Sequence, residues 1–203
     1  MQEKKLNLGC FDKPVAGWLN TDITPHIWIS KIPGLPRFVA FLGFMTEERL
    51  AQHKKNVFSE VHFMDVRKRF PFPSESFDFV YSSHLLEHLF PEEAEKCLSE
   101  TYRVLKSGGL VRFAVPDLDE IVKNYDPLDP EKTLKSIFEY GKTKNRGKNS
   151  HHWLYNENLL NLKLRAAGFV EVTRRGFQEG KCPDLAQIED RPQSLFMEAI
   201  KIL

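Results

Sequence analysis

Two histidines, a carboxylate and two serine hydroxyls follow directly on a short apolar run in the segment Phe77 to His88, FDFVYSSHLLEH. The apolar run is rich in aromatic and β-branched residues, which favour a buried strand. In an open α/β sheet, ligands bind in the crevice beyond the carboxyl ends of the strands. We therefore expect Ser82, Ser83 and His84 to lie where chemistry is done, with a helix running from His84 to Pro91.

Two further groups could join His84 around one pocket. Asp117 follows the next predicted strand, and the pair His151-His152 precedes a later helix. Histidine is the side chain most often used as a general base. We take His84, Asp117 and His151 as candidate catalytic residues. The alternatives are structural: Asp117 would cap a helix, and His88 would help to pack the helix against the sheet.

The elements that must position these groups can be predicted from hydrophobic periodicity and turn residues. Strands are expected near 5–8, 18–21, 61–64, 77–81, 110–115, 169–173 and 195–201, and helices near 46–55, 91–105 and 156–167. Residues 9–18 leave little room for a crossover helix. Residues 24–45, rich in proline and aromatics, are expected to be irregular and to cover the core. The alternation of strands and helices predicts a mainly parallel sheet between helices.

Three strand ends carry residues suited to a nucleoside. Gly9 follows the first strand and would let a ligand approach the backbone closely. Asp22 ends the second strand and can accept hydrogen bonds from both hydroxyls of a ribose. Asp65 ends the third and can accept from an exocyclic amine such as that of adenine. The alternative is that each aspartate merely caps a turn or a helix, but the series on successive strands favours the nucleoside site.

The order and spacing of several motifs resemble those of class I S-adenosylmethionine-dependent methyltransferases. The matching segments are LNLGC…GWLNTDI, the strand ending in Asp65, FDFVYSSHLLEHL and ETYRVLKSGGLVRFAVPDL. Counterparts of HHWLYNENLLNLKLRAAGF and RPQSLFMEAIK occur in the small predicted-methyltransferase branch, which is methyltransferase type 11-like. The resemblance implies one domain over 1–203 with an α/β fold: a Rossmann-like, doubly wound, seven-stranded sheet with helices on both faces and the last strand antiparallel.

The same resemblance implies S-adenosylmethionine as cofactor and S-adenosylhomocysteine as product. The cofactor-binding residues would be Gly9, Cys10, Phe11, Asp22, Ile23, Asp65, Val66, Ser82 and Ser83. Asp22 would hold the ribose, Asp65 would flank the adenine, and the serine backbone would meet the methionine amino group. One departure is that Phe11 stands where the family has a glycine. A phenylalanine adopts positive φ only at a cost, and its ring would fill space needed by the cofactor.

The implied function is methyl transfer to an unidentified small-molecule acceptor, a hydroxyl or an amine, with sugar and polysaccharide precursors among the compatible classes. Two alternatives stay open. Phe11 and the aromatic tract 28–44 suggest a non-catalytic cofactor-binding or regulatory module. The letters HLLEH also match the H-x-x-E-H pattern of one class of zinc hydrolases. No third ligand is identifiable, so we assign no metal.

The charge and composition of the chain argue against several classes of partner and location. The formal net charge of +1 gives no field for nucleic acid. Cys10, Cys97 and Cys182 form no CxxC pair, which argues against a zinc ribbon or a disulfide framework and favours a cytoplasmic protein.

The N-terminus lacks the apolar core of a signal peptide, and the apolar stretch 38–45 is too short to span a bilayer. That stretch is a candidate homodimer surface. The basic loop 142–150 is expected to be solvated, or else to contact phosphate.

Overall fold

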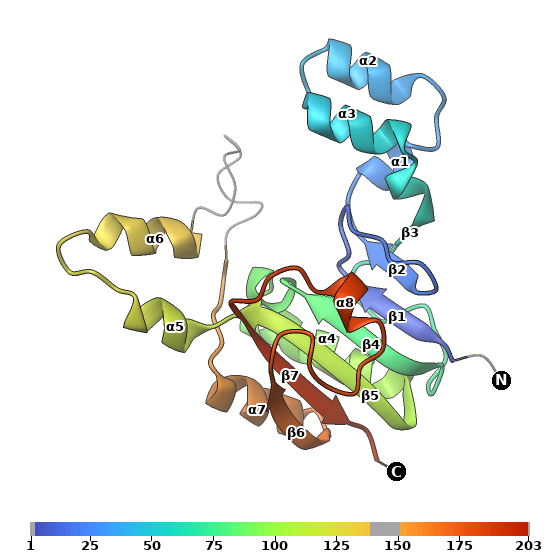
Figure 1. The fold of residues 1–203 in the computed structure, drawn as a ribbon. Coiled ribbons are helices and arrows are strands. Elements are labelled where there is room, and N and C mark those ends of the chain that lie inside the picture. Colours follow the sequence, from blue (N-terminus) through green and yellow to red (C-terminus); the bar gives the residue numbers. More distant parts are fainter. Residues whose placement is uncertain (1–2, 139–150, 203) are drawn as a thin grey trace.

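A single seven-stranded sheet organises the computed structural model, which describes residues 3–138 and 151–202 (Figure 1). The strands are β1 (Lys5–Leu8), β2 (Leu19–Asp22), β3 (Val61–Phe63), β4 (Phe77–Ser83), β5 (Leu105–Pro116), β6 (Val170–Arg175) and β7 (Ser194–Ile200). Their order is β3-β2-β1-β4-β5-β7-β6. β1 to β5 pair in parallel, and β7 runs antiparallel to both neighbours. The predicted seven-stranded fold with an antiparallel last strand is confirmed.

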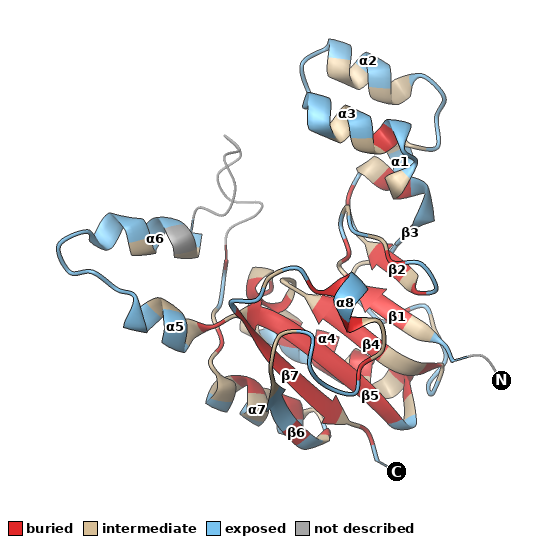
Figure 2. Ribbon diagram, viewed as in Figure 1, coloured by how far each residue is buried: buried red, intermediate tan, exposed pale blue. Residues whose placement is uncertain are grey.

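The two faces of the sheet are covered unequally. On one face, α4 (Pro91–Val104) and α7 (Glu157–Ala166) bury apolar stripes in the main core, with Leu98 and Leu160 almost fully enclosed. Burying one such side chain stabilises the fold by about 1.5–3 kcal/mol. Among the described residues, the other face carries only the short α8 (Leu185–Ile188) and loops, packed on Trp18 and Tyr81. Figure 2 shows the resulting band of buried residues along the central strands.

Two helical segments follow strands β2 and β5 at their carboxyl ends. The first contains α1 (His26–Ile29), which packs beside β3, and α2 (Leu35–Phe41) and α3 (Glu47–Lys54), of which α2 lies farthest from the sheet (Figure 1). The expectation that residues 24–45 are irregular and cover the core holds only at α1, where Ile27 is buried against Cys10 and Val61; α2 is helical, and Phe41 and Phe44 are 85% and 81% exposed. The second contains α5 (Leu118–Lys123) and α6 (Pro130–Phe138). The predicted basic loop 142–150 lies outside the described residues.

The chain after β4 does not form the helix predicted from His84 to Pro91. Only a 3₁₀ turn, Leu86–His88, is present. The backbone N–H of His84 donates to the carbonyl of Ala114 at 2.8 Å, so pairing with β5 continues past the strand. The following α4 begins at Pro91, and a residue before proline is disfavoured in the helical region. Phe90 is accordingly extended. The connection between β1 and β2 contains no helix, as expected.

Candidate active site

The strand ends predicted to bind a nucleoside meet at one edge of the sheet, because β1, β2 and β4 are parallel neighbours. Gly9 follows β1 with a φ of +67°. A Cβ atom there would lie 2.9 Å from Leu85 Cδ1, too close for any residue but glycine without a shift of the leucine. The next residue, Cys10, donates its N–H to Thr21 of β2 at 3.1 Å. The turn is therefore held tightly against both strands.

Asp22 lies beside this turn and faces it with its carboxylate. Oδ2 accepts the backbone N–H of Phe11 at 3.0 Å, and Oδ1 accepts that of Thr24 at 2.7 Å. Burial raises the pKa of this carboxyl above its ordinary value, and the backbone donors only partly offset that effect. An ionised carboxylate has about four acceptor positions, so roughly two remain for a ligand. Ile23, the next residue, is half exposed.

Phe11 does adopt positive φ, at 48°, despite the cost expected from the sequence. The left-handed conformation costs about 1–2 kcal/mol for a residue other than glycine. The guanidinium of Arg49 from α3 lies 4.4 Å from the centre of the Phe11 ring. Such a cation–π contact contributes about 0.5–1 kcal/mol at an exposed site. Together with the hydrogen bond to Asp22, this contact explains how the loop holds a phenylalanine in a glycine-like conformation.

Asp65 follows β3, as predicted, but its carboxylate is largely occupied. Arg67 engages both oxygens, with Nε to Oδ1 at 2.8 Å and Nη2 to Oδ2 at 2.9 Å, and donates its backbone N–H to Oδ1 at 3.1 Å. These bonds hold the pKa of Asp65 below its ordinary value. About one acceptor position is left for an adenine amine. The adjacent Val66 is buried and contributes to the core.

Ser82, Ser83 and His84 lie at the end of β4, as predicted. The Ser82 hydroxyl is buried and has no hydrogen-bond partner among the described residues. Both ring nitrogens of His84 are engaged: Nε2 lies 2.8 Å from Ser194 Oγ, and Nδ1 lies 3.0 Å from Glu87 Oε1. From the sequence, Glu87 was counted among the polar groups after the apolar run but was not paired with His84, and Ser194 was not considered. The only signal for Glu87 was its place within HLLEH, and Ser194 had none.

The other two candidate catalytic residues are held differently. Asp117 caps α5 by accepting the N–H of Asp119 at 3.1 Å, and it accepts a hydrogen bond from Arg174 Nη2 at 2.9 Å. The first of these contacts is the helix cap that the structural alternative predicted for Asp117. His151 is 6% exposed, and its ring lies 5.0 Å from that of His88. The structure therefore brings His151 near the turn after β4 and places Asp117 in an ion pair beyond β5.

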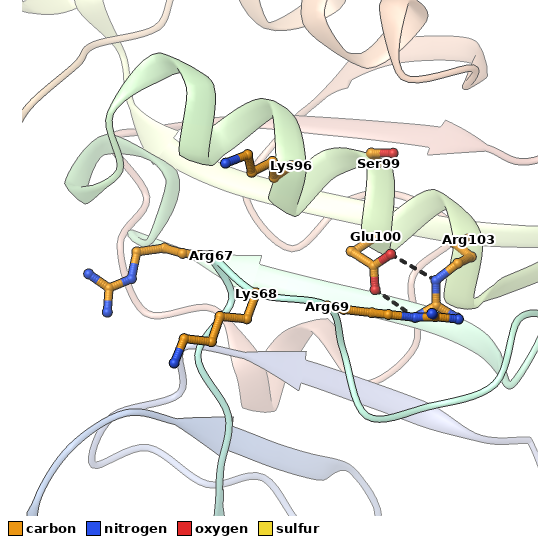
Figure 3. A pocket seen from close by; sticks show the side chains of 7 residues that line it. All are labelled: Arg67, Lys68, Arg69, Lys96, Ser99, Glu100 and Arg103. Carbon is orange, nitrogen blue, oxygen red and sulfur yellow. Dashed lines mark hydrogen bonds and ion pairs between the residues drawn. The ribbon is translucent and has the colours of Figure 1, made fainter.

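A basic hollow lies between the loop after β3 and α4 and shares Arg67 with the Asp65 ion pair (Figure 3). It is lined by Arg67, Lys68, Arg69, Lys96, Ser99, Glu100 and Arg103. Glu100 pairs with Arg103, three residues along α4, at 2.6 Å (Figure 3). No local sequence pattern indicates this hollow, because its cations come from two segments some thirty residues apart. Within the residues that the structure describes, no helix is long and apolar enough to cross a membrane.

Comparisons with known proteins agree with this architecture. Residues 43–113 match the family described as Methyltransferase domain. A SAM-dependent methyltransferase from Methanosarcina mazei has a TM-score of 0.56 and 16% identity, over 100% of this chain and 93% of that one. One from Archaeoglobus fulgidus has a TM-score of 0.55 and 17% identity, over 98% and 86%.

A third solved structure contains the expected reaction product. PigF with SAH has a TM-score of 0.54 and 15% identity, over 99% of this chain. This chain spans only 57% of the length of PigF. At these identities the solved structures establish the fold, and the match to the methyltransferase domain family covers residues 43–113. The chain therefore has the fold of S-adenosylmethionine-dependent methyltransferases, and its residues 43–113 resemble the methyltransferase domain family.

Proposed function

We propose that this protein transfers a methyl group from S-adenosylmethionine to a hydroxyl or amine of a small molecule, with the cofactor laid across the carboxyl ends of β1, β2 and β4. The observation that carries the proposal is the Asp22 carboxylate beside the Gly9 turn. Its two remaining acceptor positions match the two hydroxyls of a ribose. The glycine admits the close backbone approach that a ligand needs there.

The rest of the cofactor would follow the sheet edge in both directions from Asp22. Adenine would lie toward β3, against Ile23, Val66 and the one open position of Asp65. The methionine part would lie toward β4, over Cys10 and the backbone of Ser82 and Ser83. SAH, which the related PigF structure contains, has the same adenosine and differs only by the methyl group.

The acceptor would bind beyond β4, where His84 and Ser194 meet at 2.8 Å. Methyl transfer is an in-line displacement, so the main task of the protein is to orient the acceptor and exclude water. We propose that this pair hydrogen-bonds to the reacting oxygen or nitrogen, with Glu87 holding the imidazole in place. Asp117 and His151 would shape the pocket rather than contact the transferred methyl group.

Calorimetric titration of the purified protein with S-adenosylmethionine and S-adenosylhomocysteine tests the cofactor. One-to-one binding at micromolar affinity is expected for both. Absence of binding in folded protein would refute the proposal, whereas binding without turnover on any acceptor would favour a non-catalytic cofactor-binding module.

Acceptor binding is tested separately, by formation of S-adenosylhomocysteine across a panel of sugars, phenols and amines. With an active acceptor, His84→Gln should lower kcat while leaving the affinity for S-adenosylhomocysteine unchanged. His62→Gln, an exposed histidine on β3, is the matched control. A His84→Gln variant with full turnover would remove His84 from the site.

A further inference from the structure

Glu87, His88 and His151 bring one carboxylate and two imidazoles together in a partly buried cluster, and we propose that this cluster binds a divalent transition-metal ion, zinc in the first instance. One ligand atom from each of the three residues lies within 4.8 Å of the other two. Two histidines and one carboxylate form a ligand set known from zinc sites that keep an open position. The inference concerns metal binding and does not depend on the proposed methyl transfer.

The geometry needs little adjustment to hold an ion. An ion at the centre of a triangle with sides of at most 4.8 Å lies no more than about 2.8 Å from each corner. Zinc–nitrogen and zinc–oxygen distances are about 2.0–2.2 Å. Each ligand atom must therefore move toward the ion by less than about 1 Å, and small χ rotations can supply such a shift. Three protein ligands leave the fourth tetrahedral position for water or another small ligand.

The backbone holds the two distant segments in register. The carbonyl of Glu87 accepts hydrogen bonds from the N–H of His152 at 2.7 Å and of Trp153 at 3.2 Å. The ring of His152 also stacks on that of Phe90, with centroids 4.2 Å apart. These contacts fix His151 against the turn that carries Glu87 and His88. The third ligand that could not be identified from the sequence thus comes from more than sixty residues away.

The Glu87 carboxylate is a second, independent observation that indicates a cation. Its side chain is fully buried, and neither oxygen accepts a hydrogen bond from a described residue in good geometry. Oε1 lies 3.0 Å from His84 Nδ1, which leaves Oε2 for a further partner. A buried carboxylate without such partners costs several kcal/mol, and a bound cation removes that cost. His84 would then orient the carboxylate, as groups behind a metal ligand commonly do.

The arrangement differs from the H-x-x-E-H zinc site considered as an alternative. That pattern requires two histidines four apart on one helical face, but His84 precedes a 3₁₀ turn rather than lying on a helix. Its ring nitrogens contact Ser194 and Glu87. The structure assigns the ligand role to Glu87 and His88 with His151, and so offers no support for the hydrolase pattern itself.

Metal analysis and zinc titration of the full-length protein test the inference. Protein purified without added metal, or stripped with a chelator and titrated with Zn²⁺ by calorimetry, should bind one equivalent. Loss of an outer partner of a metal ligand typically lowers affinity 10–100-fold. His151→Ala and His88→Ala each remove a ligand itself, so a loss of about 100-fold or more is expected. His62→Ala, an exposed histidine on β3 and outside the cluster, should bind zinc like the wild type.

A second readout covers variants that fold poorly. Zinc at 100 times its Kd should stabilise the wild type by about 2.7 kcal/mol, seen as a higher Tm, and should not stabilise His151→Ala. Failure of folded wild-type protein to bind one equivalent of zinc would overturn the inference. So would an affinity that is the same in the wild type, His88→Ala and His151→Ala, because zinc would then be bound elsewhere.

Discussion

Replacing Asp22 by asparagine is the substitution that tests the cofactor site most directly. The carboxylate accepts two backbone N–H groups and has about two acceptor positions left for the ribose hydroxyls. Asparagine has a single carbonyl oxygen and presents an NH₂ group to at least one of the donors. Hydrogen bonds to a charged group contribute about 1.5–3 kcal/mol. Since 1.4 kcal/mol is a factor of ten, Asp22→Asn should raise the Kd for S-adenosylhomocysteine by roughly 10–150-fold.

A ligand without the ribose hydroxyls separates this loss from a general disturbance of the loop. The 2′,3′-dideoxy analogue of S-adenosylhomocysteine should bind the wild type and Asp22→Asn with nearly equal affinity, measured by calorimetry. The control Asp78→Asn changes an aspartate at the start of β4, at the opposite end of that strand, and should leave both affinities unchanged. Equal losses for both ligands in Asp22→Asn would show that the variant acts through the Phe11 loop, and the ribose assignment would be withdrawn.

The raised pKa of Asp22 adds a pH signature to the same experiment. Burial favours the protonated carboxyl, so protonation begins at a higher pH than for an ordinary aspartate. Because the neutral acid accepts ribose hydrogen bonds less well, cofactor affinity should fall on acidification in the wild type. It should stay flat over the same range in Asp22→Asn. A parallel fall in both proteins would assign the pH effect to another group.

Three further predictions concern stability and the turn. Gly9→Ala should destabilise the fold by about 1–2 kcal/mol, because alanine would have to adopt the positive φ of Gly9, and it should weaken cofactor binding. A variant with the urea midpoint and the cofactor affinity of the wild type would contradict this prediction. Burial beside His53 and Arg49 lowers the pKa of His26 to about 4, below the 6.5 expected when unfolded. Between pH 6.5 and pH 4 the unfolded state therefore binds more protons than the folded state, so the free energy of unfolding should fall as pH drops from about 6.5 to about 4. His26→Phe should reduce this dependence of stability on pH. Arg112 is fully buried and pairs with Glu189 and Glu198, so Arg112→Met should lower the free energy of unfolding by about 3–5 kcal/mol in chemical denaturation. A loss below about 1 kcal/mol would contradict this prediction.

The sequence by itself determined the sheet and the edge at which a ligand would bind. Apolar runs, glycine turns and capping residues are local signals, and they were sufficient for the strands, for α3 capped by Thr46 and for α7 capped by Asn156. Parallel strands place their ends together, so Gly9 and Asp22 could be assigned to one edge before any coordinates were known. The resemblance to a known family added the antiparallel last strand, which periodicity alone does not indicate.

Only the tertiary structure decided how the polar side chains are paired. The apparent helix after β4 is lost because backbone pairing with β5 and the proline at 91 outweigh helical spacing. The conformation of Phe11 depends on Arg49, which lies on a helix thirty-eight residues later. The grouping of His151 with Glu87 depends on long-range backbone hydrogen bonds. Such contacts join residues with no fixed spacing along the chain, and so no local pattern in the sequence can predict them.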